Sequence, residues 1–161
     1  MKKKKVLFIA STGGHLDELL QLKGMFDKYD YHLITERTKS NLSLKDKYPK
    51  RVNFLVYGSY TKPLSKLVYP FKLGYNTLKS FILYMIIRPK YIVSTGAHTS
   101  GPMLLIGHIF GSKIIFIETF ANSNSKSKTG TLVSKFADLF IVQWPTMKKI
   151  YPNSTYGGWI Y

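Results

Sequence analysis

The chain has 161 residues, enough for one domain with a hydrophobic core and too few for the two full domains of many nucleotide-dependent enzymes. It is 45% hydrophobic, as folded globular proteins are, and it contains no cysteine, which excludes disulfides, thiolate catalysis and zinc sites built on sulfur. The net charge is +16, with 18 Lys and Arg against three acidic residues from Arg37 onward, so the surface either attracts polyanions such as nucleic acid, anionic lipid head groups and diphosphates, or is simply soluble and basic.

The amino-terminal segment carries basic residues before an apolar run at 6–10, which leads into Gly13 and Gly14. The run is too short for a secretion signal, and a first buried strand followed by a glycine turn fits better. A helical pattern follows over residues 16–26. We therefore expect a protein that stays in the cytoplasm.

Five further strand candidates alternate with helical or loop stretches. They are residues 31–35, 52–57, 91–94, 113–117 and 139–143. Strands that alternate with helices predict a parallel sheet covered on both faces. The expected fold class is therefore α/β, a Rossmann-like doubly wound parallel sheet, in a single domain over residues 1–161.

The segment 67–87 is almost long enough to cross a bilayer as a helix. Proline, glycine and polar residues interrupt its apolar run, so it is a poor candidate for a membrane-spanning helix. A helix starting after Pro70 would carry Lys72, Asn76 and Lys79 on one face and an apolar end from Phe81 onward. Lys62 and Lys66 precede it. Such a helix suits the plane of a membrane surface. The alternative is an ordinary sheet-covering helix with a buried apolar end.

The first strand ends in Ser11, Thr12, Gly13, Gly14 and His15, at the carboxyl edge of the sheet where doubly wound folds bind ligands. Paired glycines let the backbone approach a ligand closely, and amides at the start of the next helix favour a diphosphate, although a plain tight turn explains the glycines equally well. The His15 imidazole could accept a proton from an attacking sugar hydroxyl, or it could only cap or hydrogen-bond.

A second glycine-bearing loop follows the strand candidate at 91–94 and opens another helix. Its glycines are Gly96 and Gly101, and its polar candidates are His98 and Ser100. Because the carboxyl ends of parallel strands meet at one edge, both loops should face one crevice. That makes a ligand site more probable than either loop does alone.

Two further side chains stand at the same predicted edge. Glu118 follows the strand at 113–117 and could bind a sugar hydroxyl, orient His15, or only balance nearby lysines. Trp144 could stack on a sugar or a partner, or belong to the edge of the core. The four scattered histidines form no recognisable metal cluster, so we expect no metal site.

Five stretches together resemble one family. They are residues 11–15, 94–102, 116–118, 137–145 (Ala-Asp-Leu-Phe-Ile-Val-Gln-Trp-Pro) and 156–158 (Tyr-Gly-Gly). The chain resembles, over nearly its whole length, the membrane subunit of the two-component N-acetylglucosaminyltransferase of the dolichol pathway and its bacterial capsule and exopolysaccharide relatives, the glycosyltransferase enhancer proteins. The same loops look like those of the amino-terminal half of the peptidoglycan lipid-linked N-acetylglucosaminyltransferase, an enzyme of the B-type glycosyltransferase fold.

The resemblance implies a peripheral protein on the cytoplasmic face of the cell membrane that binds a lipid-diphosphate-linked acceptor. It implies a heterodimer whose other subunit holds the UDP-sugar, so this chain needs no cofactor of its own and ends where the donor domain would begin. By the same resemblance Gly13 and Gly14 face the diphosphate, His15 is the proposed base, and Gly96 and Gly101 shape the acceptor cleft. The amino-terminal anchor of the eukaryotic subunit is missing, which leaves segment 67–87 and the basic surface to hold an anionic membrane.

Two other functions remain in view. A stand-alone small nucleotide-sugar-binding enzyme would have to hold its donor without a second domain. A nucleic-acid-binding module would use the high positive charge and the aromatic residues, but the sequence has no basic recognition helix and no aromatic RNA-binding strand motif, so we expect no nucleic-acid partner.

Overall fold

The structure is a computed structural model that describes residues 3–58 and 63–160, with only the backbone for residues 63–66. Within these residues the strands form one parallel sheet in the order β3-β2-β1-β4-β5-β6-β7. Their bounds are β1 Lys5–Ala10, β2 Asp30–Glu36, β3 Val52–Leu55, β4 Tyr91–Gly96, β5 Lys113–Ile117, β6 Leu139–Val142 and β7 Thr155–Tyr156. The predicted doubly wound α/β fold is confirmed.

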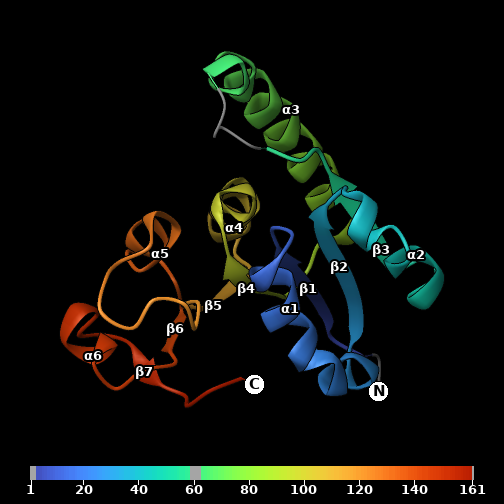
Figure 1. Cartoon of the computed structure of the whole chain (residues 1–161). Helices are drawn as coiled ribbons and strands as arrows, with labels where there is room; N and C mark the ends of the chain where they lie inside the picture. Colours follow the sequence, from blue (N-terminus) through green and yellow to red (C-terminus); the bar gives the residue numbers. More distant parts are fainter. Residues whose placement is uncertain (1–2, 59–62, 161) are drawn as a thin grey trace.

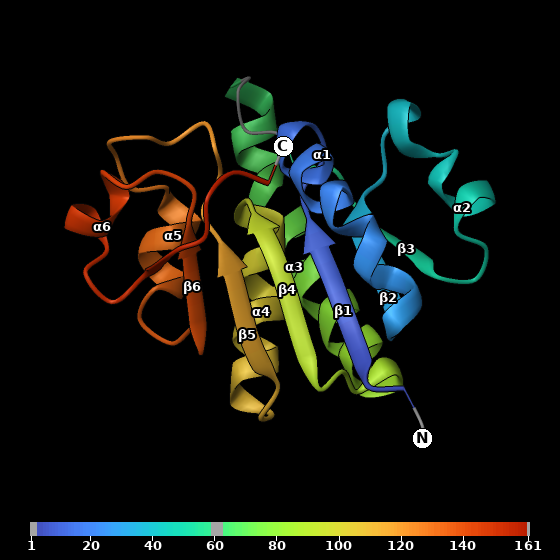
Figure 2. The ribbon, with the colours of Figure 1, turned by 90° about the horizontal axis from the view of Figure 1, so that it is seen from below.

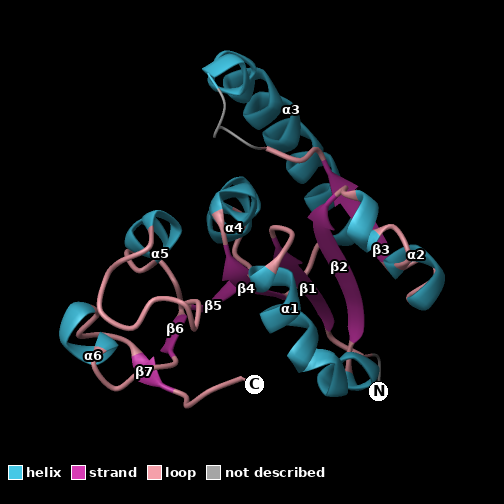
Figure 3. Cartoon of the chain, viewed as in Figure 1, coloured by secondary structure: helices cyan, strands magenta, loops and turns pink. Residues whose placement is uncertain are grey.

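Helices cover both faces of this sheet (Figures 1 and 3). On one face lie α1 (Gly14–Gln21), the 3₁₀ segment η1 (Leu22–Lys28) and α2 (Leu44–Lys47). On the other lie α3 (Pro63–Ile87), α4 (Gly101–Ile109), α5 (Lys128–Val133) and α6 (Met147–Ile150). The short 3₁₀ turns η2 (Lys39–Asn41) and η3 (His98–Ser100) belong to loops at the carboxyl edge.

The core explains why the strands read as continuous apolar runs. On β1, Leu7 and Ile9 pack with α3 and α4, whereas Val6 and Phe8 pack with α1 and η1, and all four side chains are buried. Because both faces are covered, alternation between apolar and polar residues is absent. The strand predictions were therefore correct to within a few residues.

The strand order reverses direction between β1 and β4, which are neighbours although they are far apart in the sequence. Figure 2 shows their arrowheads pointing the same way, with the start of α1 and the carboxyl terminus near that edge. At such a switch point the loops after the two strands diverge to opposite faces and leave a crevice. Both predicted glycine loops meet there.

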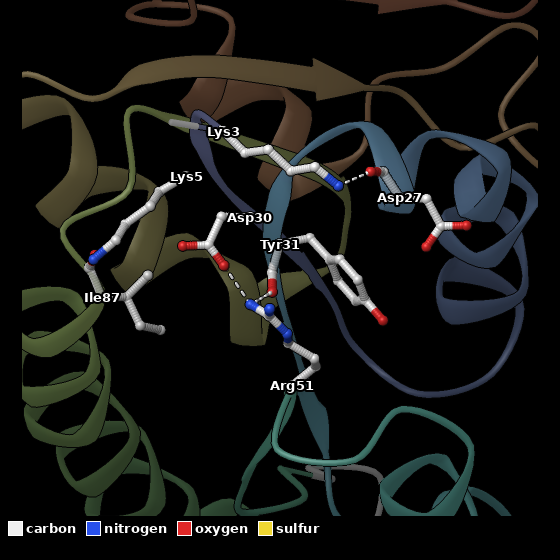
Figure 4. Close-up of polar contacts among 7 residues, drawn as sticks. All are labelled: Lys3, Lys5, Asp27, Asp30, Tyr31, Arg51 and Ile87. Atoms are coloured by element: carbon white, nitrogen blue, oxygen red, sulfur yellow. Dashed lines mark hydrogen bonds and ion pairs between the residues drawn. The ribbon is translucent and has the colours of Figure 1, made fainter. Parts of the chain in front are cut away.

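The opposite end of the sheet is tied by polar contacts (Figure 4). Arg51 pairs with Asp30 and donates to the carbonyl oxygen of Tyr31 at 3.1 Å. The hydrogen bond from Arg51 lowers the pKa of the Asp30 carboxyl. Lys5 Nζ donates to the carbonyl oxygen of Ile87 at 3.0 Å, at the end of α3 where a cation also complements the helix dipole. These contacts hold the amino-terminal ends of the strands, which lie at the edge of the sheet opposite the glycine loops.

The predicted helix at 16–26 needs correction, because the α-helix ends at Gln21 and the chain continues as 3₁₀ helix. Gly24 lies in that stretch, and glycine disfavours a regular α-helix. The strand predicted to reach Tyr57 stops at Leu55. The backbone amide and carbonyl of Val56 are both hydrogen-bonded to the Asn76 side chain, at 2.8 Å each, so they are not available for strand pairing. The two-residue strand β7 was not predicted.

The helix predicted to begin after Pro70 begins at Pro63 and contains Pro70 in its interior. A proline there removes one backbone hydrogen bond, and because Pro70 is exposed, the carbonyl left over can be hydrated. Asn76 was predicted to lie on the same polar face of the helix as Lys72 and Lys79. Instead it is buried against the end of β3, which fixes how α3 leans on the sheet.

Candidate functional site

A cleft of about 310 Å³ opens at the switch point between β1 and β4. We call it the switch-point cleft. It is lined by residues from α1, from the β4 and β5 ends, and from the start of α5. Among them are His15, Gly96, His98, Glu118, Ser127 and Lys128. The sequence placed the first four at one sheet edge, and the structure brings them together.

His15 is held by two hydrogen bonds to a single residue of β4. Its Nδ1 lies 2.8 Å from the carbonyl oxygen of Thr95, and the Thr95 hydroxyl donates to the carbonyl oxygen of His15 at 2.6 Å. A carbonyl oxygen can only accept, so Nδ1 carries the proton. The neutral ring then has its lone pair on Nε2, which is the arrangement required of a proton acceptor.

The glycines have different roles. Gly96 has φ of +97°, and a Cβ there would meet His15 Nδ1 at 3.3 Å, so glycine at this position leaves room for the imidazole. Gly13 has φ of +80° and serves as the N-cap of α1. A Cβ on Gly13 or Gly14 would have no neighbour within 4 Å. The space in front of the first helical amides is therefore open to a ligand.

Glu36, which the sequence analysis missed, ties three loops together from the end of β2. Its buried carboxylate accepts hydrogen bonds from the amide of Thr12 at 3.1 Å, the amide of Gly58 at 3.1 Å and the hydroxyl of Thr99 at 2.6 Å. The only sequence feature that could have identified it is its position at the carboxyl end of a buried strand. Thr12, a predicted acceptor ligand, is thereby anchored toward β2, where its hydroxyl also accepts from Asn41 at 3.3 Å.

The predicted residues of the loop after β4 do not all line the cleft. His98 lines the cleft, and because Gly58 offers a carbonyl oxygen 2.9 Å from Nε2, that nitrogen is the donor. Ser100 is fully buried and donates to the carbonyl oxygen of Ala97 at 2.6 Å, so its hydroxyl stabilises the loop from within. Gly101 lies outside the cleft, at the start of α4.

Glu118 lines the cleft but is 1% exposed and surrounded by donors. One oxygen accepts from Tyr151 at 2.8 Å and Ser127 at 3.0 Å, and the other from the amide of Thr119 at 3.1 Å. His15 is oriented by Thr95 and not by this carboxylate. The neighbouring carboxylate raises the pKa of the Tyr151 hydroxyl further, beyond the effect of burial. Glu118 therefore fixes the start of α5.

Two charged groups near the cleft were not predicted. Glu18, one turn after His15, is buried with one oxygen accepting from Thr119 and Phe120, and burial raises the pKa of its carboxyl. Its other oxygen has no hydrogen-bond partner within the described chain. Lys128 is exposed at the first turn of α5 and lines the cleft. A mobile ammonium there suits a phosphate oxygen.

The outer face of α3 is apolar. Its exposed residues recur every three or four positions, and Phe71 and Ile86 are 78% and 70% exposed. We call the exposed residues Leu67, Phe71, Leu78, Ile82 and Ile86 the α3 stripe. Phe81 is also exposed on this helix and lies against Phe110, with 5.9 Å between ring centroids.

Beside the α3 stripe lies a hollow of about 600 Å³ with basic walls. Lys72 and Lys79, which the sequence placed on one helix face, line it together with Arg37 and Lys45, and its described lining carries no acidic side chain. Lys62 lies outside the described residues, and the side chain of Lys66 does too. An apolar stripe beside a cationic hollow is typical of a surface that meets anionic lipid.

An aromatic cluster lies near the carboxyl terminus. Trp144 and Trp159 lie 5.1 Å apart between ring centroids, and both contact Phe120. Trp144 Nε1 donates to the carbonyl oxygen of Phe120 at 2.7 Å, whereas Trp159 is 59% exposed. Trp144 is thus an edge-of-core residue, whereas Trp159 is largely exposed apolar surface.

Within residues 3–58 and 63–160, no three acidic or histidine side chains gather as a metal site, and no helix joins the length and apolarity that crossing a bilayer requires.

Comparison with known proteins identifies the family to which the sequence is similar. Residues 63–160 match the family described as "Oligosaccharide biosynthesis protein Alg14 like". The human UDP-N-acetylglucosamine transferase subunit ALG14 is 30% identical, over 95% of this chain and 81% of the human protein. A UDP-N-acetylglucosamine–N-acetylmuramyl-(pentapeptide) pyrophosphoryl-undecaprenol N-acetylglucosamine transferase of Flavobacterium psychrophilum is 23% identical, over 93% of this chain and 42% of that enzyme.

Among solved structures, MurG of Acinetobacter baumannii is similar, with a TM-score of 0.70 and 19% identity. The match covers 89% of this chain and 42% of MurG. At this identity the likeness establishes a shared fold. The chain thus spans less than half of MurG and of the Flavobacterium enzyme.

Proposed function

Because the chain belongs to the Alg14 family of oligosaccharide biosynthesis proteins, we propose that it is the acceptor-binding, membrane-associated subunit of a two-component glycosyltransferase. The observation that carries the proposal is the switch-point cleft, which the oriented imidazole of His15 and the side chain of Lys128 both line, directly after the open glycine turn at Gly13 and Gly14. The Flavobacterium relative, whose acceptor is a pyrophosphoryl-undecaprenol, supports the same class of acceptor here.

The acceptor diphosphate lies at the first turn of α1. Gly13 and Gly14 leave this space open, and the first amides of the helix, those of Gly14 and His15, donate to phosphate oxygens at the favourable end of the helix dipole. Lys128 supplies a charge from the other side of the cleft. Gly96 shapes the floor, and His98 holds its loop in place.

His15 acts as the general base. Its Nε2 accepts the proton of the acceptor sugar hydroxyl while that oxygen bonds to the anomeric carbon of the donor sugar, and the bond from that carbon to UDP breaks with its electron pair leaving on UDP. Thr95 keeps the imidazole in the accepting tautomer and stabilises the imidazolium through its carbonyl oxygen. Glu118 holds the wall of the cleft through its hydrogen bonds from Ser127 and Tyr151.

The UDP-sugar is held by a separate subunit. The relatives' names, each a UDP-N-acetylglucosamine transferase subunit, support this division. Trp159, exposed near the carboxyl edge, is the surface for that partner. The names of the relatives support a UDP-N-acetylglucosamine donor. The sequence resemblance to the bacterial enhancer proteins supports a role in capsule or exopolysaccharide synthesis.

The protein is peripheral on the cytoplasmic face of the membrane. The α3 stripe enters the interface, and the cationic hollow beside it binds anionic head groups. This places the switch-point cleft close to the lipid that carries the acceptor.

The test is sugar transfer from UDP-N-acetylglucosamine to a lipid-diphosphate-linked acceptor, measured with this chain alone, with the donor-binding subunit alone, and with both. We expect activity only from the pair. Full activity from this chain alone would instead support the alternative, a stand-alone nucleotide-sugar-binding enzyme.

A further inference from the structure

A second hollow lies beside the switch-point cleft, over the outer surface of α4. It has a volume of about 440 Å³ and lies between α3 and α5, which flank α4 in Figure 1. We call it the α4 groove. Its apolar walls are Leu73 from α3, Pro102, Leu105, Ile106 and Ile109 from α4, and Leu132 from α5.

These walls are exposed to water in the described chain. Ile109 is 67% exposed, and Leu105 and Leu132 are 44% and 46% exposed. The α4 residues recur at helical spacing, so α4 turns one apolar strip toward the groove, and Leu73 and Leu132 flank it. A contiguous apolar groove of this kind marks a binding surface.

The groove is continuous with the cleft. His98, Lys128 and Thr129 line both, and among the residues that the structure describes Lys128, at this junction, is the only charged side chain lining the α4 groove. A ligand that spans the two must therefore have an anionic group at the junction, polar groups on the cleft side and a hydrocarbon chain on the groove side. That order matches a sugar-diphosphate-lipid.

We propose that the α4 groove binds the first isoprene units of the acceptor lipid, next to its diphosphate. The inference rests on the proposed function and adds a subsite to it. The groove draws the head of the lipid out of the interface and aligns the diphosphate with α1, and the rest of the chain stays in the membrane below the α3 stripe.

The test compares binding of farnesyl diphosphate and methyl diphosphate to the full chain by calorimetry, without membranes. Each buried methylene strengthens binding about fourfold, so a few buried carbons make farnesyl diphosphate at least about tenfold tighter. Leu105→Ser and Leu132→Ser, on different helices, should each remove much of that difference and leave methyl diphosphate unchanged. Leu78→Ser is the matched control, because Leu78 is 60% exposed on α3 and does not line the groove.

The outcomes separate the two proposals. Equal affinity for both diphosphates, or equal effects of Leu78→Ser and Leu105→Ser, overturns the groove and leaves the cleft standing. Failure of methyl diphosphate to bind while farnesyl diphosphate binds through Leu105 supports the groove and contradicts the diphosphate position. If neither compound binds, and hydrogen exchange in α4 slows only when the donor-binding subunit is added, the groove is a protein interface and the inference is wrong.

Discussion

The Nδ1 of His15 lies 2.8 Å from the carbonyl oxygen of Thr95, and the Thr95 hydroxyl returns a hydrogen bond to the backbone of His15. His15, in the first turn of α1, is thus oriented by Thr95 near the end of β4, the strand that neighbours β1 across the switch point. The fold itself selects the tautomer that leaves Nε2 free of a proton.

His15→Ala should lower turnover by about 10²-fold to 10⁴-fold in the two-subunit complex, with the dissociation constant of the acceptor nearly unchanged. The reason is that the imidazole acts on the hydroxyl in the transition state and not on the diphosphate. Steady-state kinetics with acceptor titration measures both quantities. Near-normal turnover would remove His15 from the mechanism, and loss of acceptor affinity alone would make it a positioning residue.

Gly96→Ala should lower turnover because its Cβ would press on the His15 ring at 3.3 Å. Gly111→Ala is the control, since Gly111 has a similar φ of +84° but no neighbour within 4 Å of a Cβ. Both variants should lose about 1–2 kcal/mol of unfolding free energy from backbone strain. Only Gly96→Ala should lose activity, and equal losses of activity would contradict the contact with His15.

Glu36→Gln should destabilise the protein by about 1–3 kcal/mol and weaken acceptor binding. The NH₂ group of the glutamine would point at a hydrogen-bond donor at one of the positions where the carboxylate now accepts from Thr12, Gly58 or Thr99. The three loops would then no longer be held by one side chain. Thr99→Val removes one donor and keeps the other two, so it should cost less. Denaturant unfolding measures the stability of both variants. An unchanged unfolding midpoint for Glu36→Gln would show that Glu36 does not hold the three loops together.

Vesicle binding should depend on both the α3 stripe and the cationic hollow. Leu78→Ser with Ile82→Ser should weaken binding to anionic and neutral vesicles alike, since these side chains are exposed. Lys72→Gln with Lys79→Gln should weaken binding to anionic vesicles only, by roughly 1 kcal/mol per charge, and raised salt should mimic it. Flotation that is unchanged in both double variants would show that this face does not meet the membrane.

The sequence was sufficient to predict the sheet and the meeting of the two glycine loops, because buried parallel strands carry long apolar runs and their carboxyl ends converge. It did not reveal that Thr95 orients His15, since a backbone carbonyl leaves no mark in the sequence. Glu118 looked functional because it is an isolated acid at the right edge, but Tyr151 and Ser127 satisfy it from later elements. Such pairings follow from packing, which local patterns do not encode.

The helix α3 shows the same limit. Its apolar composition was visible, but the orientation of each face was not. Asn76 faces the protein, where it binds the end of β3, and Phe71 and Leu78 face outward. A polar residue that fits one specific backbone site reverses the usual placement of polar and apolar faces. Only the assembled structure shows this.

We propose that this chain binds the acceptor and not the donor. Equilibrium binding of a lipid-diphosphate-linked acceptor and of UDP-N-acetylglucosamine to the chain alone, with the wild type and Gly14→Val, tests it most directly. A Cβ at Gly14 meets nothing within 4 Å, so Gly14→Val should leave the fold intact and occupy the space of the phosphate. We predict acceptor binding that Gly14→Val abolishes, and no binding of UDP-N-acetylglucosamine. Tight binding of the UDP-sugar, or acceptor binding indifferent to Gly14→Val, would contradict the account.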